Sequence, residues 1–432
     1  MLTEKEQDIL ACCDRLFEET IDLTEELIRA YSVLGQEKSA QAVIDAWYRK
    51  ENFNVTHVPL KETALSFATS HNDDQHDRVG TVSEAKASRY NVIASLNENA
   101  PGAHLVFNGH LDVVPAEPHT RWSQPPWSPW RDADGWLYGR GAGDMKAGIA
   151  AMCMAVKAVR QAGVDIHHPL TLQTVIEEEC TGHGALACVK AGHTGDFVLI
   201  PEPFGAHIVS GQAGVLWFRI SLNGVPAHVL DTSAGSNAIE AVSALFNALK
   251  PLEAEINAAP RHPLFGHIAK PFNLNLGRIQ GGDWASSVPA YASLEGRIGF
   301  PPGVAVEEMQ ARVKACVEAE AKTLAGISDL SVEFHGFCSE GVEVDLDDVG
   351  VRLLGQCHQD LTGDAVIHKP LTCTTDLRAY KIHGGINGTC YGPVAENIHG
   401  VDERVEIESI RHVLKTYALF LSRWGENAAS DI

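Results

Sequence analysis

The stretch HLVFNGHLD at residues 104–112, with GRGAGDMKAG at 139–148, decides how we expect this chain to fold. The first segment reads as a short apolar strand that leads through a glycine to His110 and Asp112. The second reads as a glycine-rich turn that presents Asp144 where a helix begins. An imidazole and carboxylates at the ends of buried elements are suitable ligands for a divalent cation. We therefore expect a metal site here and search the chain for the other ligands.

Composition and charge exclude several classes of protein. The chain has 432 residues, of which 45% are hydrophobic, so two domains with ordinary cores are expected. No apolar run is long enough for a membrane helix, and a net charge of −22 disfavours nucleic acid as a partner. The N-terminus, MLTEKEQDIL, has acids where a signal peptide needs basic and apolar residues. We expect a cytoplasmic protein whose ten cysteines are reduced thiols.

Short apolar segments alternate with amphipathic helices from residue 90 onward. The strand-like segments are 91–96, 105–107, 170–176 and 197–200, with a helix at about 144–162. This alternation predicts an α/β fold, a mostly parallel sheet sandwiched by helices, with working residues at the carboxyl ends of the strands. Helices at 3–34 and 39–50 are expected to add an N-terminal layer.

The pattern changes at residues 215–222, VLWFRISL, which alternate apolar and polar as an antiparallel strand with one covered face does. The segments that follow are a helix at 236–250, strands at 272–279 and 290–298, a helix at 305–323 and a strand at 330–336. This order, β-α-β-β-α-β, predicts a ferredoxin-like α+β unit. We expect a lid domain at 214–338, inserted into a catalytic domain made of 1–213 and 339–432. The polar segment 61–88 is expected to be a surface insertion.

Further acidic and imidazole groups follow predicted strands. Residues 177–179 are Glu-Glu-Glu, and consecutive carboxylates repel one another unless solvent or a cation relieves them. Adjacent glutamates can divide metal binding and proton transfer, although a solvated acidic turn explains the tripeptide equally well. Glu202 in IPEPF and His399 in ENIHGVDERV are weak signals singly. His228 in NGVPAH is also explained as an ordinary loop histidine.

Together, the motifs resemble the acetylornithine deacetylase / succinyl-diaminopimelate desuccinylase family of zinc amidohydrolases. This family also holds enzymes like aminoacylase-1 and the glutamate-releasing carboxypeptidases. The similar segments, in the family's order, are GHLDVVP (109–115), GRGAGDMKAG (139–148), EEECTGHGA (177–185), IPEP (200–203), NGVPAH (223–228) and IHGVDERV (398–405). Six ordered motifs over nearly the whole chain argue against a chance match.

The resemblance implies two Zn²⁺ ions, with Co²⁺ or Mn²⁺ as alternatives that accept similar ligands. Asp144 would bridge the two ions. His110 and Glu202 would complete one site. Glu179 and His399 would complete the other.

The resemblance also implies roles around the metals. Glu178 would be the general base, and Asp112 would accept the second N–H of the first metal-binding imidazole and so fix its tautomer. His228 would reach over from the lid, in its own subunit or a partner's, to stabilise the oxyanion. Arg297 matches a lid arginine that holds a substrate carboxylate in relatives, and Asn275 is a weaker candidate. Glu177 is left as a supporting or surface group.

We therefore expect a homodimeric, metal-dependent hydrolase that cleaves the amide bond of a small N-acylated amino acid or related N-acyl amine. Nucleic acid and membranes are not expected as partners. A metallo-exopeptidase or dipeptidase and an N-formyl amine deformylase are the alternatives within the family. A non-catalytic zinc-dependent scaffold is the alternative from another class, and it predicts a missing ligand or base, which the sequence does not show. Ser286-Ser287-Val288-Pro289 stand where relatives that cleave glutamyl substrates often carry Asn, so the substrate does not follow from the resemblance.

Overall fold

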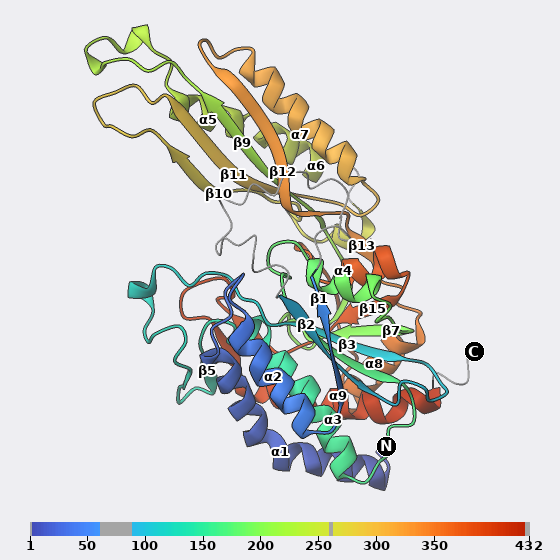
Figure 1. The fold of residues 1–432 in the computed structure, drawn as a ribbon. Helices are drawn as coiled ribbons and strands as arrows, with labels where there is room; N and C mark the ends of the chain where they lie inside the picture. The colour runs from blue at the N-terminus through green and yellow to red at the C-terminus, as the bar shows by residue number, and fades with distance from the viewer. Residues whose placement is uncertain (1, 61–88, 259–261, 428–432) are drawn as a thin grey trace.

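A computed structural model describes residues 2–60, 89–258 and 262–427, so the predicted insertion at 61–88 lies outside the described residues. Figure 1 shows two bodies, a larger one that contains both ends of the chain and a smaller one above it. No described helix combines the length and apolar character that crossing a membrane requires.

The larger body is built around a six-stranded sheet in the order β1-β2-β6-β3-β7-β15. Its strands are β1 (Asn54–Pro59), β2 (Tyr90–Leu96), β3 (Leu105–His110), β6 (Leu170–Val175), β7 (Phe197–Ile200) and β15 (Asn387–Cys390). β6, β3, β7 and β15 are parallel neighbours, whereas β2 pairs antiparallel with both β1 and β6. The sheet is mostly parallel, which confirms the predicted fold class.

Helices cover both faces of this sheet, as the alternation of side chains along β3 shows. Phe107 points to one face, where its ring meets Tyr417 at 5.2 Å between centroids. Asn108 points to the other face and bonds to the side chains of Asp376 and Tyr380. The helices of this body are α1 (Glu4–Arg29), α2 (Lys38–Lys50), α3 (Ala147–Gln161), α4 (His183–Lys190), α8 (Val349–Thr362) and α9 (Ile407–Asn427). α1, α3 and α9 pack on one another on the Phe107 side, and α4 packs against η7 (Ala379–Gly384) on the Asn108 side.

α1 begins at a capping box between Thr3 and Glu6 and ends short of its predicted end. Ala30 leaves the helical conformation (φ −75°, ψ 99°). The buried Lys146 ammonium donates to the carbonyl oxygens of Leu27 (2.7 Å) and Ala30 (3.2 Å). A cation at carbonyls that have no helical partner is a favourable helix terminus. The end of α1 is thereby tied to the turn that carries Asp144.

The smaller body has a four-stranded antiparallel sheet in the order β10-β11-β9-β12. Its elements are β9 (Gly214–Asn223), α5 (Ala238–Asn247), α6 (Lys250–Ala258), β10 (Leu274–Gly281), β11 (Tyr291–Phe300), α7 (Val306–Ala321) and β12 (Ser328–Ser339). This is the predicted ferredoxin-like order with one addition, since α5 and α6 follow each other where one helix was expected.

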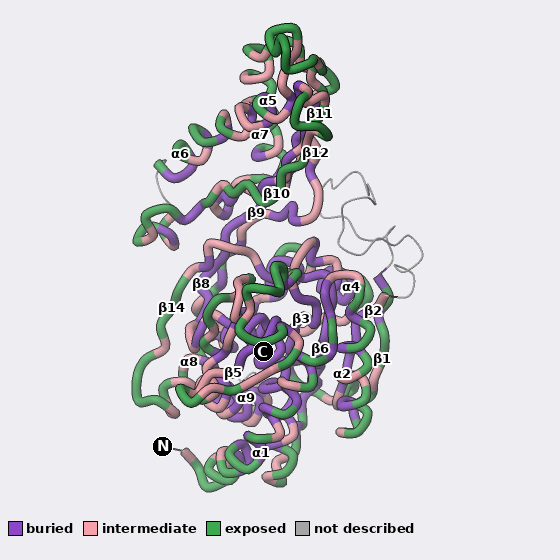
Figure 2. Tube along the Cα trace, turned by 90° about the vertical axis from the view of Figure 1, so that its left-hand side faces the viewer, coloured by how far each residue is buried: buried purple, intermediate pink, exposed green. Residues whose placement is uncertain are grey.

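Each body has its own hydrophobic core (Figure 2). Buried residues from Ala213 to Cys338 form one core, and buried residues up to Val209 and from Val342 onward form the other. Between the bodies, β8 (Ile208–Gln212) pairs with β13 (Val342–Glu343) and β14 (His368–Leu371). The division into a catalytic domain (1–213 and 339–432) and a lid (214–338) stays a proposal, which these separate cores support.

Candidate metal centre

Asp144 lies between two imidazoles. Its Oδ1 is 3.1 Å from Nε2 of His110, and its Oδ2 is 3.3 Å from Nε2 of His399. The same His399 nitrogen is 3.1 Å from Oε2 of Glu179, and the His110 nitrogen is 3.9 Å from Oε1 of Glu202. The structure therefore brings the five predicted ligands together, with Asp144 between the two imidazoles.

The sheet explains why these side chains meet. His110 is the last residue of β3, and Glu202 follows β7, its parallel neighbour. Glu179 follows β6, which lies on the other side of β3. Asp144 lies in the turn before α3, and His399 lies in the loop between β16 (Ala395–Glu396) and β17 (Arg404–Glu406). The carboxyl ends of parallel strands share one edge, where ligands of α/β proteins gather.

The carboxylates of this cluster lie closer together than their mutual repulsion would favour. Glu202 and Glu178 are 3% and 5% exposed, and burial raises the pKa of both well above the usual value, with help from neighbouring carboxylates and against the effect of His110. Glu179 raises the pKa of His399 to about 11, against the effect of burial. Burial opposes a charged His110, but its bond to Asp144 and the nearby glutamates raise its pKa well above the usual value. Clustered acids beside two imidazoles are a donor set that fits divalent cations.

Asp112 differs in detail from the prediction that its carboxylate accepts the second N–H of His110. The backbone oxygen of Asp112 accepts that N–H at 2.8 Å, while the carboxylate oxygen is 3.8 Å from the ring nitrogen. The fully buried carboxylate instead accepts the backbone N–H groups of Glu178 (3.2 Å) and Glu179 (3.0 Å). A buried carboxylate needs hydrogen-bond donors, and the backbone N–H groups of the acidic turn need acceptors, so each satisfies the other. Asp112 thus orients the imidazole through its main chain and holds the turn through its side chain.

Glu177 is not a surface group. It is 3% exposed and ion-paired with Arg89, and the hydroxyl of Thr181 donates to it at 2.7 Å. Its φ of 67° lies in the left-handed region, where a non-glycine residue is held only by its surroundings. The solvated acidic turn is therefore wrong as an account of residues 177–179, because Glu177 anchors a buried turn that presents the other two glutamates.

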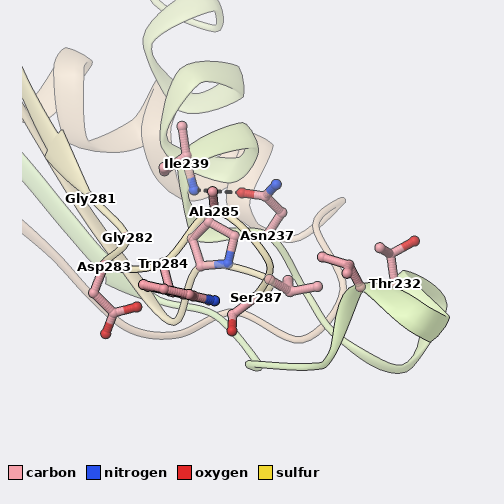
Figure 3. Close-up of a pocket in the computed structure, with 12 residues that line it drawn as sticks. Thr232, Asn237, Ile239, Gly281, Gly282, Asp283, Trp284, Ala285 and Ser287 are labelled. Atoms are coloured by element: carbon pink, nitrogen blue, oxygen red, sulfur yellow. Dashed lines mark hydrogen bonds between the residues drawn. The ribbon is translucent and has the colours of Figure 1, made fainter.

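The structure does not bring His228 to this centre. Its side chain is exposed, its Nδ1 accepts the N–H of Leu230 at 3.0 Å, and its backbone bridges to Ser287. The segment that follows, η5 (Val229–Ala234), lies at the end of the smaller body away from the larger one (Figure 1). Figure 3 shows the hollow beside it, lined among others by Thr232, Trp284 and Ser287.

Arg297 and Asn275 are paired across β11 and β10. Burial lowers the pKa of Arg297, and the Cys373 thiol of the larger body opposes that effect, so this guanidinium faces the junction of the two bodies. Its Nε is buried without a hydrogen-bond partner among the described residues. Asn275 is exposed on the edge strand.

Sequence reasoning missed the segment LTCTTDLRAY at 371–380. Asp376 and Arg378 in it are 1% and 0% exposed. Burial lowers the pKa of Arg378, and the nearby charges of Glu178 and Asp376 oppose this. Burial raises the pKa of the Cys373 thiol to about 12, and the nearby charge of Glu202 is the next largest cause. The only signal of this segment in the sequence is an acidic residue, Asp376, two positions before a basic one, Arg378, after a short strand.

The chain thus joins a mixed sheet, which carries this cluster at the carboxyl edge of its parallel strands, to a smaller ferredoxin-like body. Residues 106–423 match the peptidase family M20/M25/M40, and the chain belongs to this family. The expectation of an amidohydrolase from this group is thereby confirmed.

Relatives similar in sequence include a deformylase and a desuccinylase. The N-formyl-4-amino-5-aminomethyl-2-methylpyrimidine deformylase of Bacillus subtilis (strain 168) is 28% identical over 359 residues, which are 77% of this chain and 83% of the relative. The succinyl-diaminopimelate desuccinylase of Cupriavidus necator is 26% identical over 423 residues, which are 94% of this chain and 98% of the relative.

Among solved structures, the dipeptidase Dug1p of Saccharomyces cerevisiae superposes with a TM-score of 0.82 at 14% identity, over 98% of each chain. Human carnosine dipeptidase 1 gives a TM-score of 0.72 at 16% identity, over 98% of this chain and 100% of that one. YXEP of Bacillus subtilis, a dinuclear metal-binding peptidase of the M20 family, gives 0.62 at 15% identity, over 96% and 99%. These likenesses show the fold.

Proposed function

We propose that the chain removes the acyl group from a small N-acylated amino acid or related N-acyl amine, with two Zn²⁺ ions held by His110, Asp144, Glu179, Glu202 and His399. The observation that carries the proposal is the placement of both Asp144 oxygens between two imidazoles, with a buried glutamate beside them. Divalent ions bound there would lower the pKa of a water molecule and polarise the substrate carbonyl.

Glu178 is the proposed proton carrier. Its carboxylate takes a proton from the attacking water, whose oxygen bonds to the carbonyl carbon. It then gives that proton to the nitrogen as the C–N bond breaks, which leaves a carboxylic acid and an amine, and the acid gives its remaining proton to the amine or to solvent. A buried carboxyl group with a raised pKa is suited to this exchange near neutral pH.

His228 is the proposed oxyanion donor, supplied by a second copy of the chain. In one chain its side chain is exposed, and the segment η5 that follows it lies at the end of the smaller body away from the larger one (Figure 1). The edge strand β10 supports dimerisation through the lid, because Leu276 and Ile279 are exposed on it and no strand among the described residues pairs with its outer side. We propose a homodimer that works in the cytoplasm.

The substrate is proposed to carry a carboxylate. The half-buried Arg297 has a buried Nε without a hydrogen-bond partner among the described residues and lies near Cys373 of the larger body, and its planar guanidinium could bind a carboxylate through two parallel hydrogen bonds. Both N-acyl amino acids and dipeptides carry this group. The deformylase and desuccinylase names of the relatives favour the first class, and a dipeptidase is the second candidate.

A hydrolysis panel on the zinc-loaded protein tests the proposal. The panel compares N-formyl, N-acetyl and N-succinyl amino acids with dipeptides and with an N-formyl amine that has no carboxylate. We expect the highest kcat/KM on an N-acyl amino acid, with activity lost after chelation and restored by zinc. Preferred cleavage of dipeptides would support the second candidate, and no metal-dependent cleavage of any amide would refute both.

A further inference from the structure

Two loops that are far apart in the chain meet behind the metal centre. β5 (Trp136–Tyr138) pairs with β17, so that Tyr138 lies opposite Arg404. The loop that leads from β5 to Asp144 therefore runs beside the loop that leads from His399 to β17. The buried pair of Arg140 and Glu403 lies between these two loops.

Glu403 binds the Asp144 turn through both of its carboxylate oxygens. Oε1 accepts the backbone N–H groups of Gly143 and Asp144, each at 3.0 Å. Oε2 accepts the N–H of Gly141 at 3.0 Å and Nη1 of Arg140 at 2.6 Å. Four donors on one carboxylate leave it no role as a metal ligand, although it is 1% exposed and close enough to Asp144 to feel its charge.

Arg140 connects the same carboxylate to the His399 loop. Its Nη2 donates to the carbonyl oxygens of Gly400 at 3.0 Å and Pro115 at 3.3 Å. His399 has a φ of 62°, in the left-handed region, so its loop needs outside support to keep this conformation. One ion pair thus holds the turn of Asp144 and the loop of His399 at a fixed separation.

We propose that Glu403 is a positioning residue for the metal centre, acting with Arg140, and that it matters more for the ion held by Asp144, Glu179 and His399 than for the other. This inference rests on the proposed function. The other ion would also be held by His110 and Glu202. These residues lie at the carboxyl ends of β3 and β7 in the central sheet, so their positions do not depend on the pair of Arg140 and Glu403. Groups that orient metal ligands change metal affinity by about 10–100-fold when they are removed.

Glu403→Gln tests the inference, because an amide has a single acceptor oxygen. Its NH₂ group must face either the N–H groups of Gly143 and Asp144 or those of Arg140 and Gly141, so one pair is lost. Arg140→Lys keeps the positive charge but has a single nitrogen where Arg140 uses Nη1 for Glu403 and Nη2 for Gly400. The matched control is Glu396→Gln, which removes an exposed carboxylate that binds Arg404 at 2.5 Å in the same sheet.

The measurement is zinc stoichiometry and the two dissociation constants, by titration against a competing chelator, with circular dichroism to verify folding. We expect one of the two dissociation constants of Glu403→Gln to rise about 10–100-fold while the other changes little. Arg140→Lys should give a smaller loss of affinity for the same ion. This variant provides the test if Glu403→Gln does not fold. The control should match the wild type.

Equal weakening of both ions, or two unchanged constants, would overturn the inference and leave the proposed function intact. A wild-type chain that binds no ion would overturn both. The readout does not depend on turnover, so it separates positioning from catalysis.

Discussion

Three consecutive glutamates have three different surroundings. Glu177 pairs with Arg89, Glu179 meets the His399 imidazole, and Glu178 is buried among carboxylates near His110. Neighbours in an irregular turn point in different directions, so each carboxylate meets its own partners. The proposed division between one anchor, one proton carrier and one ligand follows from these contacts.

Glu178→Gln removes the proposed proton carrier and keeps the shape of the side chain. We expect kcat to fall on the order of 10²–10⁴-fold, because an amide cannot accept and return the proton. Zinc content, measured by mass spectrometry, should stay at the wild-type value, since this side chain is not a proposed ligand. Loss of an ion in this variant would show that Glu178 and Glu179 have exchanged roles.

At the scale of elements, α8 and α9 are joined through the hydroxyl of Tyr391. It lies 2.8 Å from Nδ1 of His358 in α8 and 2.8 Å from Nε2 of His412 in α9. Burial, with help from His358 and Lys415, lowers the pKa of His412 to about 4. In the folded chain the His412 imidazole at this contact is therefore neutral near pH 7.

The pH dependence of stability follows from that lowered pKa. In the unfolded chain His412 takes up a proton near its ordinary pKa of about 6.5, whereas in the folded chain it does so only near 4. Protons thus favour the unfolded state between these values, and the metal-free protein should lose up to about 3 kcal/mol as the pH falls from 7 to 4. Urea unfolding at several pH values, with chelator present throughout, measures this loss.

His412→Gln is the comparison, because Gln keeps a polar partner for Tyr391 without an imidazole to protonate. Its free energy of unfolding should fall less over the same pH range. An identical fall in both proteins would assign the acid sensitivity to other groups.

At the scale of the whole molecule, the metal centre and His228 lie in different bodies, and one chain does not join them. The proposed dimer gives each centre the His228 of the partner. A dimer also covers the exposed edge of β10.

Mixed dimers test this arrangement. His228→Ala alone should slow turnover at least about a hundredfold with zinc content intact, because one oxyanion donor is lost. Glu178→Gln alone should be nearly inactive. When the two inactive variants exchange subunits, half of the dimers carry one complete centre, so about a quarter of wild-type activity should return if His228 acts across the interface. No recovery after verified exchange would place His228 in its own subunit.

Closure of the lid is the second prediction at this scale. The two bodies are connected where β8 meets β9 and where β12 leads to β13, which are the expected hinges near residues 213 and 338. Binding of a substrate-like inhibitor should draw Arg297 toward the metal centre and reduce the radius of gyration. Small-angle scattering with and without the inhibitor measures the change, and superimposable profiles would contradict it.

Much of this architecture follows from local sequence. Apolar segments that alternate with amphipathic helices predict the parallel sheet, and the strict alternation at 215–222 predicts the lid strand β9. The order of six motifs indicates which acids and imidazoles belong together. Parallel strands end at one edge, so His110 and Glu202 could be expected to meet before any coordinates were known.

Other features depend on contacts between residues far apart in the chain, and no local pattern encodes them. Which atom of Asp112 reaches His110 depends on how the strand end turns, and the burial of Glu177 depends on Arg89. The pairing of Glu403 with Arg140 exists only because β5 and β17 are neighbours in a sheet. Local sequence determines which side chains are available and where strands end, whereas the distances between their atoms are set by packing that only the tertiary structure completes.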